Sequence, residues 1–136
     1  MAWFEYHVSI MESSRTSEVG HSFAIELSRI AADHKADEVV ALDLRGISSV
    51  MDFCVICTGS SDRQMRAVVD QMVEYGRIVG QGKPFGVAGY DAATWILVDF
   101  VDVVVHVFAR PYRDFYDLEL LWGDAPHLVW ARSESA

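Results

Sequence analysis

The sequence predicts a single α/β domain in which helices flank a mixed β-sheet of about five strands. Its 136 residues fit one domain with one hydrophobic core. A hydrophobic share of 51% is too high for a disordered chain. Segments with helical and strand periodicity follow the order helix, two strands, helix, three strands and helix. We expect residues 17–130 to form this domain, after an irregular extension over 1–16 and before a disordered tail over 131–136.

The first half of the chain supplies one helix and two strands. Apolar residues recur at helical spacing from Glu18 to His34, after serines and a threonine that can cap the helix. A nearly continuous apolar run over 38–44 predicts a strand that is buried on both faces. Residues 52–58 predict the second strand, and their Cys54 and Cys57 point to opposite faces of it. We therefore expect two buried free thiols rather than a disulfide or a metal site.

The second half supplies a helix, three strands and a last helix. Ser61 and Gln64 form a capping box that begins a helix running to about Val79. Its apolar stripe consists of Met65, Val68, Val69, Met72 and Val79. The three strands are predicted over residues 85–87, 94–100 and 103–109. The last two form a hairpin, Pro111 begins a helical turn over 112–116, and residues 118–122 continue this helix or dock as an apolar segment.

Charge indicates the kind of partner. The chain carries 20 acidic and 11 basic residues, for a net charge of −9. This balance argues against direct contact with nucleic acid, because phosphate binding depends on clustered Lys and Arg. It favours a basic macromolecular partner. The sequence shows no membrane span, signal peptide or transit peptide, so we expect a cytoplasmic location without membrane contact.

The stretch over 94–124 carries many groups suited to contact and few suited to catalysis. Trp95, Leu97 and Asp99 share one face of their strand, and one of its two faces must meet the helices. The other face can bind a partner through its aromatic residues, which are typical of protein interfaces and of cores alike. His106 has no nucleophile or second metal ligand near it in the sequence. It therefore favours a structural or interface role over catalysis.

An enzyme of the Mg-dependent nucleotidyltransferase type is the main alternative. The turn over 58–62 joins a strand to a helix and can hold an anion at the helix N-terminus. Such an enzyme would use Ser60 and Asp62, with Asp43 or Asp99, around Mg²⁺. The usual Asp-x-Asp pair does not follow the turn, so simple helix capping is favoured. A homodimeric structural module is a third hypothesis.

Five segments between Ser22 and Asp124 stand in a specific order and spacing. They read VALDLR (40–45), DFCVICTGS (52–60), WILVD (95–99), DVVVHVF (102–108) and RDFYDLELLW (113–122). Together they resemble the ribosomal silencing factors, the RsfS or Iojap family. The resemblance implies a nucleotidyltransferase-like fold without catalytic carboxylates, cofactor or metal. It also implies a non-enzymatic protein that binds protein fourteen of the large ribosomal subunit, blocks small-subunit docking and represses translation under nutrient limitation, with a homodimer left open.

Two positions depart from the family pattern. Ala88 stands where the family usually has Glu, and Val101 stands where its hairpin turn usually has Gly. Because a β-branched residue tolerates a positive φ poorly, we expect ordinary dihedrals or a changed turn at Val101. We expect the binding surface, or its direct support, to comprise Trp95, Asp99, His106, Phe108, Arg113, Tyr116, Leu118, Glu119 and Trp122.

Overall fold

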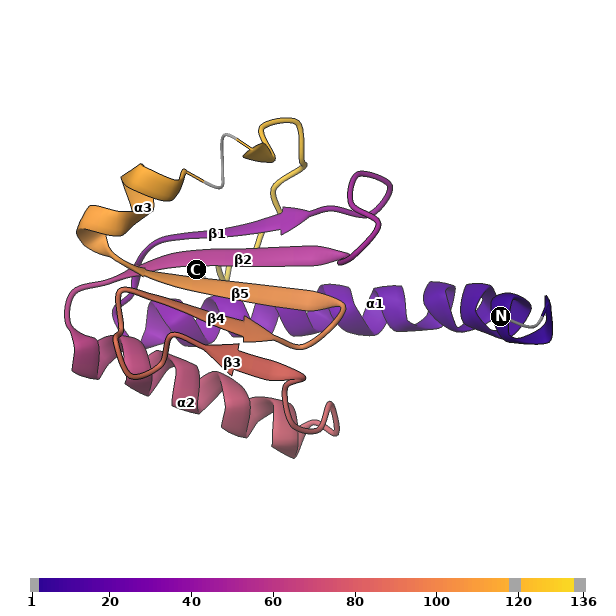
Figure 1. Ribbon diagram of the computed structural model, residues 1–136, viewed down its shortest axis with the longest axis horizontal. Helices are drawn as coiled ribbons and strands as arrows, with labels where there is room; N and C mark the ends of the chain where they lie inside the picture. Colours follow the sequence, from indigo (N-terminus) through magenta and orange to yellow (C-terminus); the bar gives the residue numbers. More distant parts are fainter. Residues whose placement is uncertain (1–2, 118–120, 134–136) are drawn as a thin grey trace.

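The computed structural model describes the backbone of residues 3–117 and 121–133, and the side chains of residues 18–114, 117 and 121–133. It shows a five-stranded mixed sheet flanked by helices (Figure 1), which confirms the predicted fold class. The helices are α1 (Trp3–Asp33), α2 (Asp62–Ile78) and α3 (Arg110–Tyr116). The strands are β1 (Asp37–Asp43), β2 (Phe53–Gly59), β3 (Gly86–Ala88), β4 (Trp95–Asp99) and β5 (Val103–Ala109).

The strands lie side by side in the order β1-β2-β5-β4-β3. The β2–β5 pair is parallel, and the other three pairs are antiparallel. A parallel pair needs a long crossover, and here α2, β3 and β4 lie between its two strands in the chain. All of β2 is buried, as is all of β5 except Ala109, which is half-buried. Their nearly continuous apolar sequences therefore suit the centre of the sheet.

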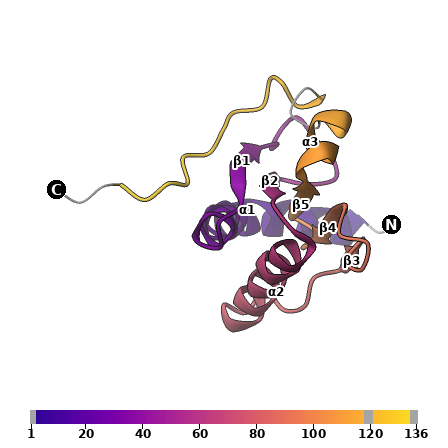
Figure 2. The same ribbon diagram turned by 90° about the vertical axis from the view of Figure 1, so that its left-hand side faces the viewer.

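Helices α1 and α2 cover one face of the sheet, whereas α3 lies on the opposite side (Figure 2). The core between the two helices and the sheet contains Phe23 and Leu27 of α1 and the predicted stripe of α2 over 65–72. Val79 also belongs to the predicted stripe, yet it is about half exposed. It lies just beyond the end of α2 and lines an open groove between α1 and α2, which explains its exposure.

The outer edge of β1 is covered by the chain's own C-terminal segment. The amide of Asp43 donates to the Pro126 carbonyl, and the amide of Leu128 donates to the Ala41 carbonyl, each at 2.8 Å. Ala41 faces the helix-side core and Leu42 faces the opposite cluster, so the strand is buried on both faces at this point. Covering the edge removes a row of unpaired backbone groups that would otherwise pair with another chain.

The same segment continues across α1. The indole of Trp130 donates to the Val39 carbonyl at 3.2 Å. Arg132 then forms a two-bond ion pair with Asp33, at 3.0 and 3.1 Å. This ion pair lies within residues 131–136, for which a disordered tail was predicted; that prediction stays a prediction, and the last three residues lie outside the described part of the chain.

The N-terminal half of α1 differs from expectation. The helix begins at Trp3, so the irregular extension expected over 1–16 is wrong for residues 3–16. These residues contain neither glycine nor proline, and nothing local therefore stops the helix from extending. In Figure 1 this half of α1 projects beyond the sheet.

The β4–β5 hairpin is confirmed, but its turn is not the one expected. Val101 has a φ of +77°, so the expectation of ordinary dihedrals is wrong. The amide of Asp102 donates to the Phe100 carbonyl at 3.1 Å, which with this φ gives a tight γ-turn centred on Val101. The Asp99 carboxylate accepts a 2.7 Å hydrogen bond from the Val101 amide. This bond holds the valine in the left-handed region.

Candidate partner-binding site

Strand β4 presents one face to the helices and one away from them. Ile96 and Val98 are fully buried in the core under α1 and α2. Trp95, Leu97 and Asp99 alternate with them and are half-buried on the other face. The face of β4 that carries Trp95 is therefore the one that α1 and α2 leave uncovered.

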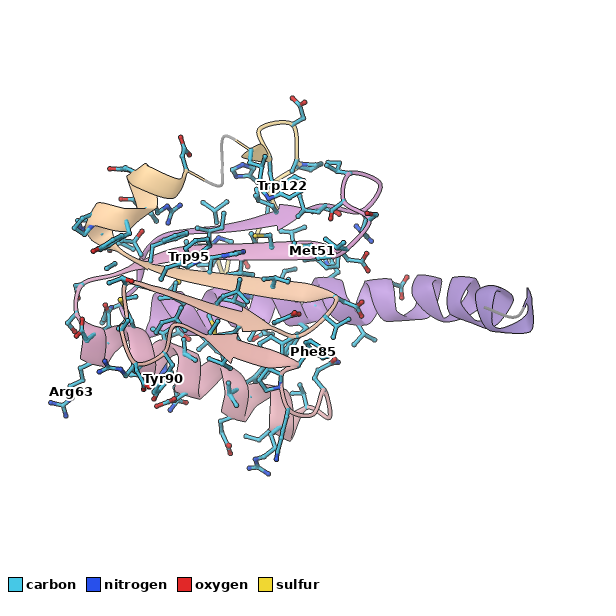
Figure 3. The ribbon with its side chains drawn as sticks, in the orientation of Figure 1. Met51, Arg63, Phe85, Tyr90, Trp95 and Trp122 are labelled. Carbon is cyan, nitrogen blue, oxygen red and sulfur yellow. The ribbon has the colours of Figure 1, made fainter. Side chains whose placement is uncertain are left out.

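Trp95 lies at the centre of an aromatic group on this face (Figure 3). Strand register places it opposite Phe108, and their rings stack with centroids 5.1 Å apart and planes 25° apart. Its indole Nε1 donates a 3.0 Å hydrogen bond to Nδ1 of His106. His106 and Phe108 also stack, at 6.2 Å and 11°. The structure therefore brings together three of the predicted site residues.

His106 is buried and neutral. It is 7% exposed, and burial alone lowers its pKa to about 4. Because Nδ1 accepts the indole hydrogen bond, the single ring proton of neutral His106 is on Nε2. His106 supports the surface from below rather than adding contact area to it.

A second apolar cluster forms the floor of this face. It consists of Leu42, Leu44, Cys54, Ile56, Phe108 and Ala125, with Val40, Met51, Trp95 and Trp122 packed against it. Phe108 is fully buried, so its role is structural. Trp122 is half-buried on the segment after α3, and Figure 3 shows it beside β1 and β2. It remains a candidate contact.

Arg113 is a buried anchor for α3. Its guanidinium donates to the Glu38 carbonyl at 2.5 Å and to the Thr58 hydroxyl at 3.0 Å. Arg110 forms ion pairs with Asp37 at 2.6 Å and with Glu38 at 3.3 Å. The two arginines thus fasten α3 to the start of β1, and Arg113 orients the surface without forming part of it.

The remaining candidates divide into two groups. Tyr116 ends α3, but its side chain lies outside the described residues, as do Leu118 and Glu119 entirely. Asp99 is described, but it caps the Val101 turn at the other end of β4. At strand rise this end is about 13 Å from Trp95. Asp99 therefore does not join the aromatic group.

The sequence-based list omitted two apolar residues near this surface. Leu97 pairs with His106 across the ladder and is half-buried beside Trp95. Leu121 is exposed on the segment that also carries Trp122. Strand alternation signals Leu97, whereas no pattern in the sequence distinguishes an exposed leucine at 121 from a buried one.

The stretch of chain that carries Trp95 has an excess of acidic residues. The stretch from Asp91 to Asp124 has seven acids and two bases, which are Arg110 and Arg113. Both bases are engaged by β1, as described above. Asp114 on α3 is exposed, as are Asp91 and Asp124. The stretch as a whole is therefore negatively charged, although Asp99 and Asp102 lie at the turn at the other end of β4 from Trp95.

The residues of the enzyme alternative do not form one site. Ser60 and Asp62 follow the end of β2, whereas Asp43 pairs with Phe53 at its start. Strand rise puts these two ends about 20 Å apart, and Asp99 lies at the same far end as Asp43.

The turn before α2 also has its own partners. The Ser61 hydroxyl accepts from the Gln64 amide at 3.1 Å, as the capping box predicts. The Gln64 side chain accepts from the amide and hydroxyl of Ser60 at 2.6 and 3.0 Å, one residue earlier than in the usual box. The amide and hydroxyl of Ser60 and the amide of Gln64 are therefore occupied within the protein.

The two cysteines are buried and free, as expected. Cys54 lies in the cluster under Trp95 and Cys57 in the core under the helices, so they are on opposite faces of β2. Burial raises the pKa of each thiol to about 12, and both are uncharged at neutral pH. Among the described residues, no three His, Cys, Asp or Glu side chains gather as a metal site.

Comparison with protein families identifies the family to which this chain belongs. Residues 17–136 match the model of RsfS, described as the ribosomal silencing factor during starvation. The chain belongs to the RsfS family. The resemblance carried by the five sequence segments is thereby confirmed, and relatives of the chain are named for a regulatory role.

Relatives and a solved structure agree with the RsfS assignment. A ribosomal silencing factor RsfS from Bacillus subtilis is 47% identical over 98 residues, which cover 69% of this chain and 79% of that protein. The chloroplastic protein Iojap of Arabidopsis thaliana is 34% identical over 110 residues, covering 76% of this chain and 43% of that one. A crystal structure from Chromobacterium violaceum superposes with a TM-score of 0.69 at 33% identity, covering 78% and 85% of the two chains. Within residues 3–117 and 121–133, each helix is too short or too polar to span a bilayer.

Proposed function

We propose that this RsfS-family protein binds the large ribosomal subunit through protein fourteen of that subunit and sterically prevents the small subunit from joining. The single observation that carries the proposal is the Trp95-centred aromatic surface, in which Trp95 stacks on Phe108 and is hydrogen-bonded to His106. Half-buried aromatic residues on a fixed support are typical anchors of protein interfaces. The net charge of −9 suits a basic ribosomal protein, and such complementarity speeds encounter and fixes register.

The proposed mechanism is steric: the protein covers the face of the large subunit at which the small subunit docks. It requires no reaction, cofactor or metal, and it acts by excluding the small subunit from the face that the protein covers. Translation then falls because fewer subunits join. We expect it to act wherever its ribosomes are, and a cytoplasmic location is part of this proposal.

Cosedimentation with purified large subunits tests the proposal. We expect the intact protein to sediment with large subunits and to reduce their association with small subunits in competition. In a Trp95→Ala protein that stays folded, we expect affinity to fall at least about thirtyfold, because truncating a central interface tryptophan costs about 2 kcal/mol or more. Absence of binding by the intact protein would overturn the proposal.

Phe85→Ala provides the matched control. Phe85 is 83% exposed and lies beside β3, away from Trp95 (Figure 3). Removing it deletes an exposed aromatic ring without touching the aromatic group. Equal losses from Phe85→Ala and Trp95→Ala would show that binding depends on apolar surface in general and not on the Trp95 surface.

A homodimer is compatible with the proposed function if its interface lies on a face other than the Trp95 surface. A symmetric dimer through the Trp95 surface would cover the face that is proposed to bind the partner. Light scattering across protein concentrations, with and without large subunits, measures which state exists and which state binds.

A further inference from the structure

We propose that His106 is a positioning residue that holds the indole of Trp95 in the orientation that a partner contacts. This inference rests on the proposed function, because it assumes that Trp95 lies in the interface. His106 is too buried to contribute much contact area of its own. Its effect on binding therefore passes through Trp95.

The geometry gives His106 a task that stacking cannot perform. The stack of Trp95 on Phe108 fixes the plane of the indole, with 25° between the rings. A stack alone fixes the ring plane but does not select between the two indole orientations that share this plane and differ by a flip of about 180° about χ2. The 3.0 Å bond from Nε1 to Nδ1 of His106 removes this freedom, because it ties one edge of the ring to β5. A partner then meets an indole whose other edge always points the same way, so little ordering entropy is lost on binding.

The bond requires neutral His106, because protonated histidine has no acceptor nitrogen. The titratable and charged groups on the elements around it do not favour its charged form. Cys54 on β2 is neutral, Asp99 on β4 caps its own turn, Arg113 on α3 is bound to Thr58, and Asp124 after α3 is exposed. The lowered pKa has burial as its cause. The bond therefore persists at neutral pH and is lost only as the pH falls toward about 4.

The first test uses the free protein. The indole N–H resonance of Trp95 is identified by its absence in Trp95→Phe and is followed by NMR from pH 7 to 3.5. In the wild type we expect it to move with an apparent pKa near 4. His106→Phe, which lacks an acceptor, should show the unbonded resonance position at every pH. His106→Asn, whose amide oxygen can replace Nδ1, should keep the bonded position and not titrate.

The second test measures the affinity for purified large subunits at pH 7.5. We expect His106→Phe to weaken binding about tenfold, the equivalent of one net hydrogen bond, and His106→Asn to recover most of the loss. His34→Phe is the matched control, because His34 is exposed at the end of α1, and its affinity should equal that of the wild type.

The two tests separate this proposal from the function on which it rests. Failure of the wild type to bind subunits would overturn the function, while the indole resonance would still decide whether His106 positions Trp95. An unchanged resonance or an unchanged affinity in folded His106→Phe would overturn the positioning role. Should His106→Phe fail to fold, the wild-type titration and His106→Asn still decide the question.

Discussion

Val101 is a β-branched residue in a backbone conformation that such residues rarely adopt. Its φ of +77° lies in the left-handed region, which disfavours L-residues and β-branched ones most of all. Its side chain is 56% exposed, so burial offsets little of this strain. The hairpin forms nevertheless, because the ladder between β4 and β5 and the Asp99 carboxylate together hold the turn.

Val101→Gly should stabilise the protein. Removing left-handed strain is worth about 1–2 kcal/mol, and the greater freedom of glycine in the unfolded chain costs about 0.5–1 kcal/mol. We therefore expect the free energy of unfolding in urea to rise by roughly 0.5–1 kcal/mol.

Val101→Ala is the control for this change. It deletes most of the same side chain but keeps a Cβ atom and therefore keeps most of the strain. Its stability should stay close to that of the wild type. A glycine variant no more stable than the alanine variant would show that the turn is not strained.

Burial divides the candidate site residues into contacts and supports. Trp95 and Trp122 are half-buried and able to touch a partner, whereas His106, Phe108 and Arg113 are buried beneath the surface. Strand alternation in the sequence predicts which residues share a face. It does not predict which face the helices cover, because that depends on packing between segments distant in the sequence. The proximity of Trp95, His106 and Phe108 was therefore predictable from their strands, but which of them are buried was not.

At the scale of elements, the periodic segments were predictable to within one or two residues. β5 was predicted over its observed bounds, and α2 ends one residue before the predicted Val79. The errors fall where periodicity is weak. The first half of α1 has no clear apolar stripe, and the C-terminal segment is irregular, so its course along β1 follows from contacts made after folding.

The C-terminal segment acts as a strap that ties β1 to α1. Trp130 packs against the helix-side core, its indole bonds Val39, and its carbonyl accepts from Arg29 at 2.7 Å. We expect Trp130→Ala to lower the free energy of unfolding by about 2 kcal/mol, because a half-buried ring and one hydrogen bond are lost. Thermal or urea unfolding measures the change.

The neighbouring residue provides a matched control for the strap. Val129 is 86% exposed, and Val129→Ala should change stability by less than about 0.5 kcal/mol, as is usual for exposed positions. Equal effects at 129 and 130 would contradict the idea that the strap is held by its indole.

At the scale of the whole molecule, both the net charge and the fold contribute to the proposed binding of a partner. Helices α1 and α2 occupy one face of the sheet, two arginines hold α3 against the start of β1, and Asp114 on α3 is exposed. In the proposed function, a net charge of −9 would attract a basic partner before contact, and the aromatic group would provide adhesion after contact. The two contributions are separable, because salt screens the first and leaves the second nearly unchanged.

Association with large subunits should therefore depend on ionic strength mainly through its rate. At constant Mg²⁺, raising monovalent salt from about 50 to about 300 mM should slow association by about tenfold and change dissociation much less. Asp114→Asn, on exposed α3, should slow association at low salt more than Asp62→Asn, an exposed position at the start of α2. Both variants carry the same net charge, so the difference isolates the position of the carboxylate. Equal rates for the two variants, or a rate that ignores salt, would show that the acidic end of the molecule does not guide the encounter.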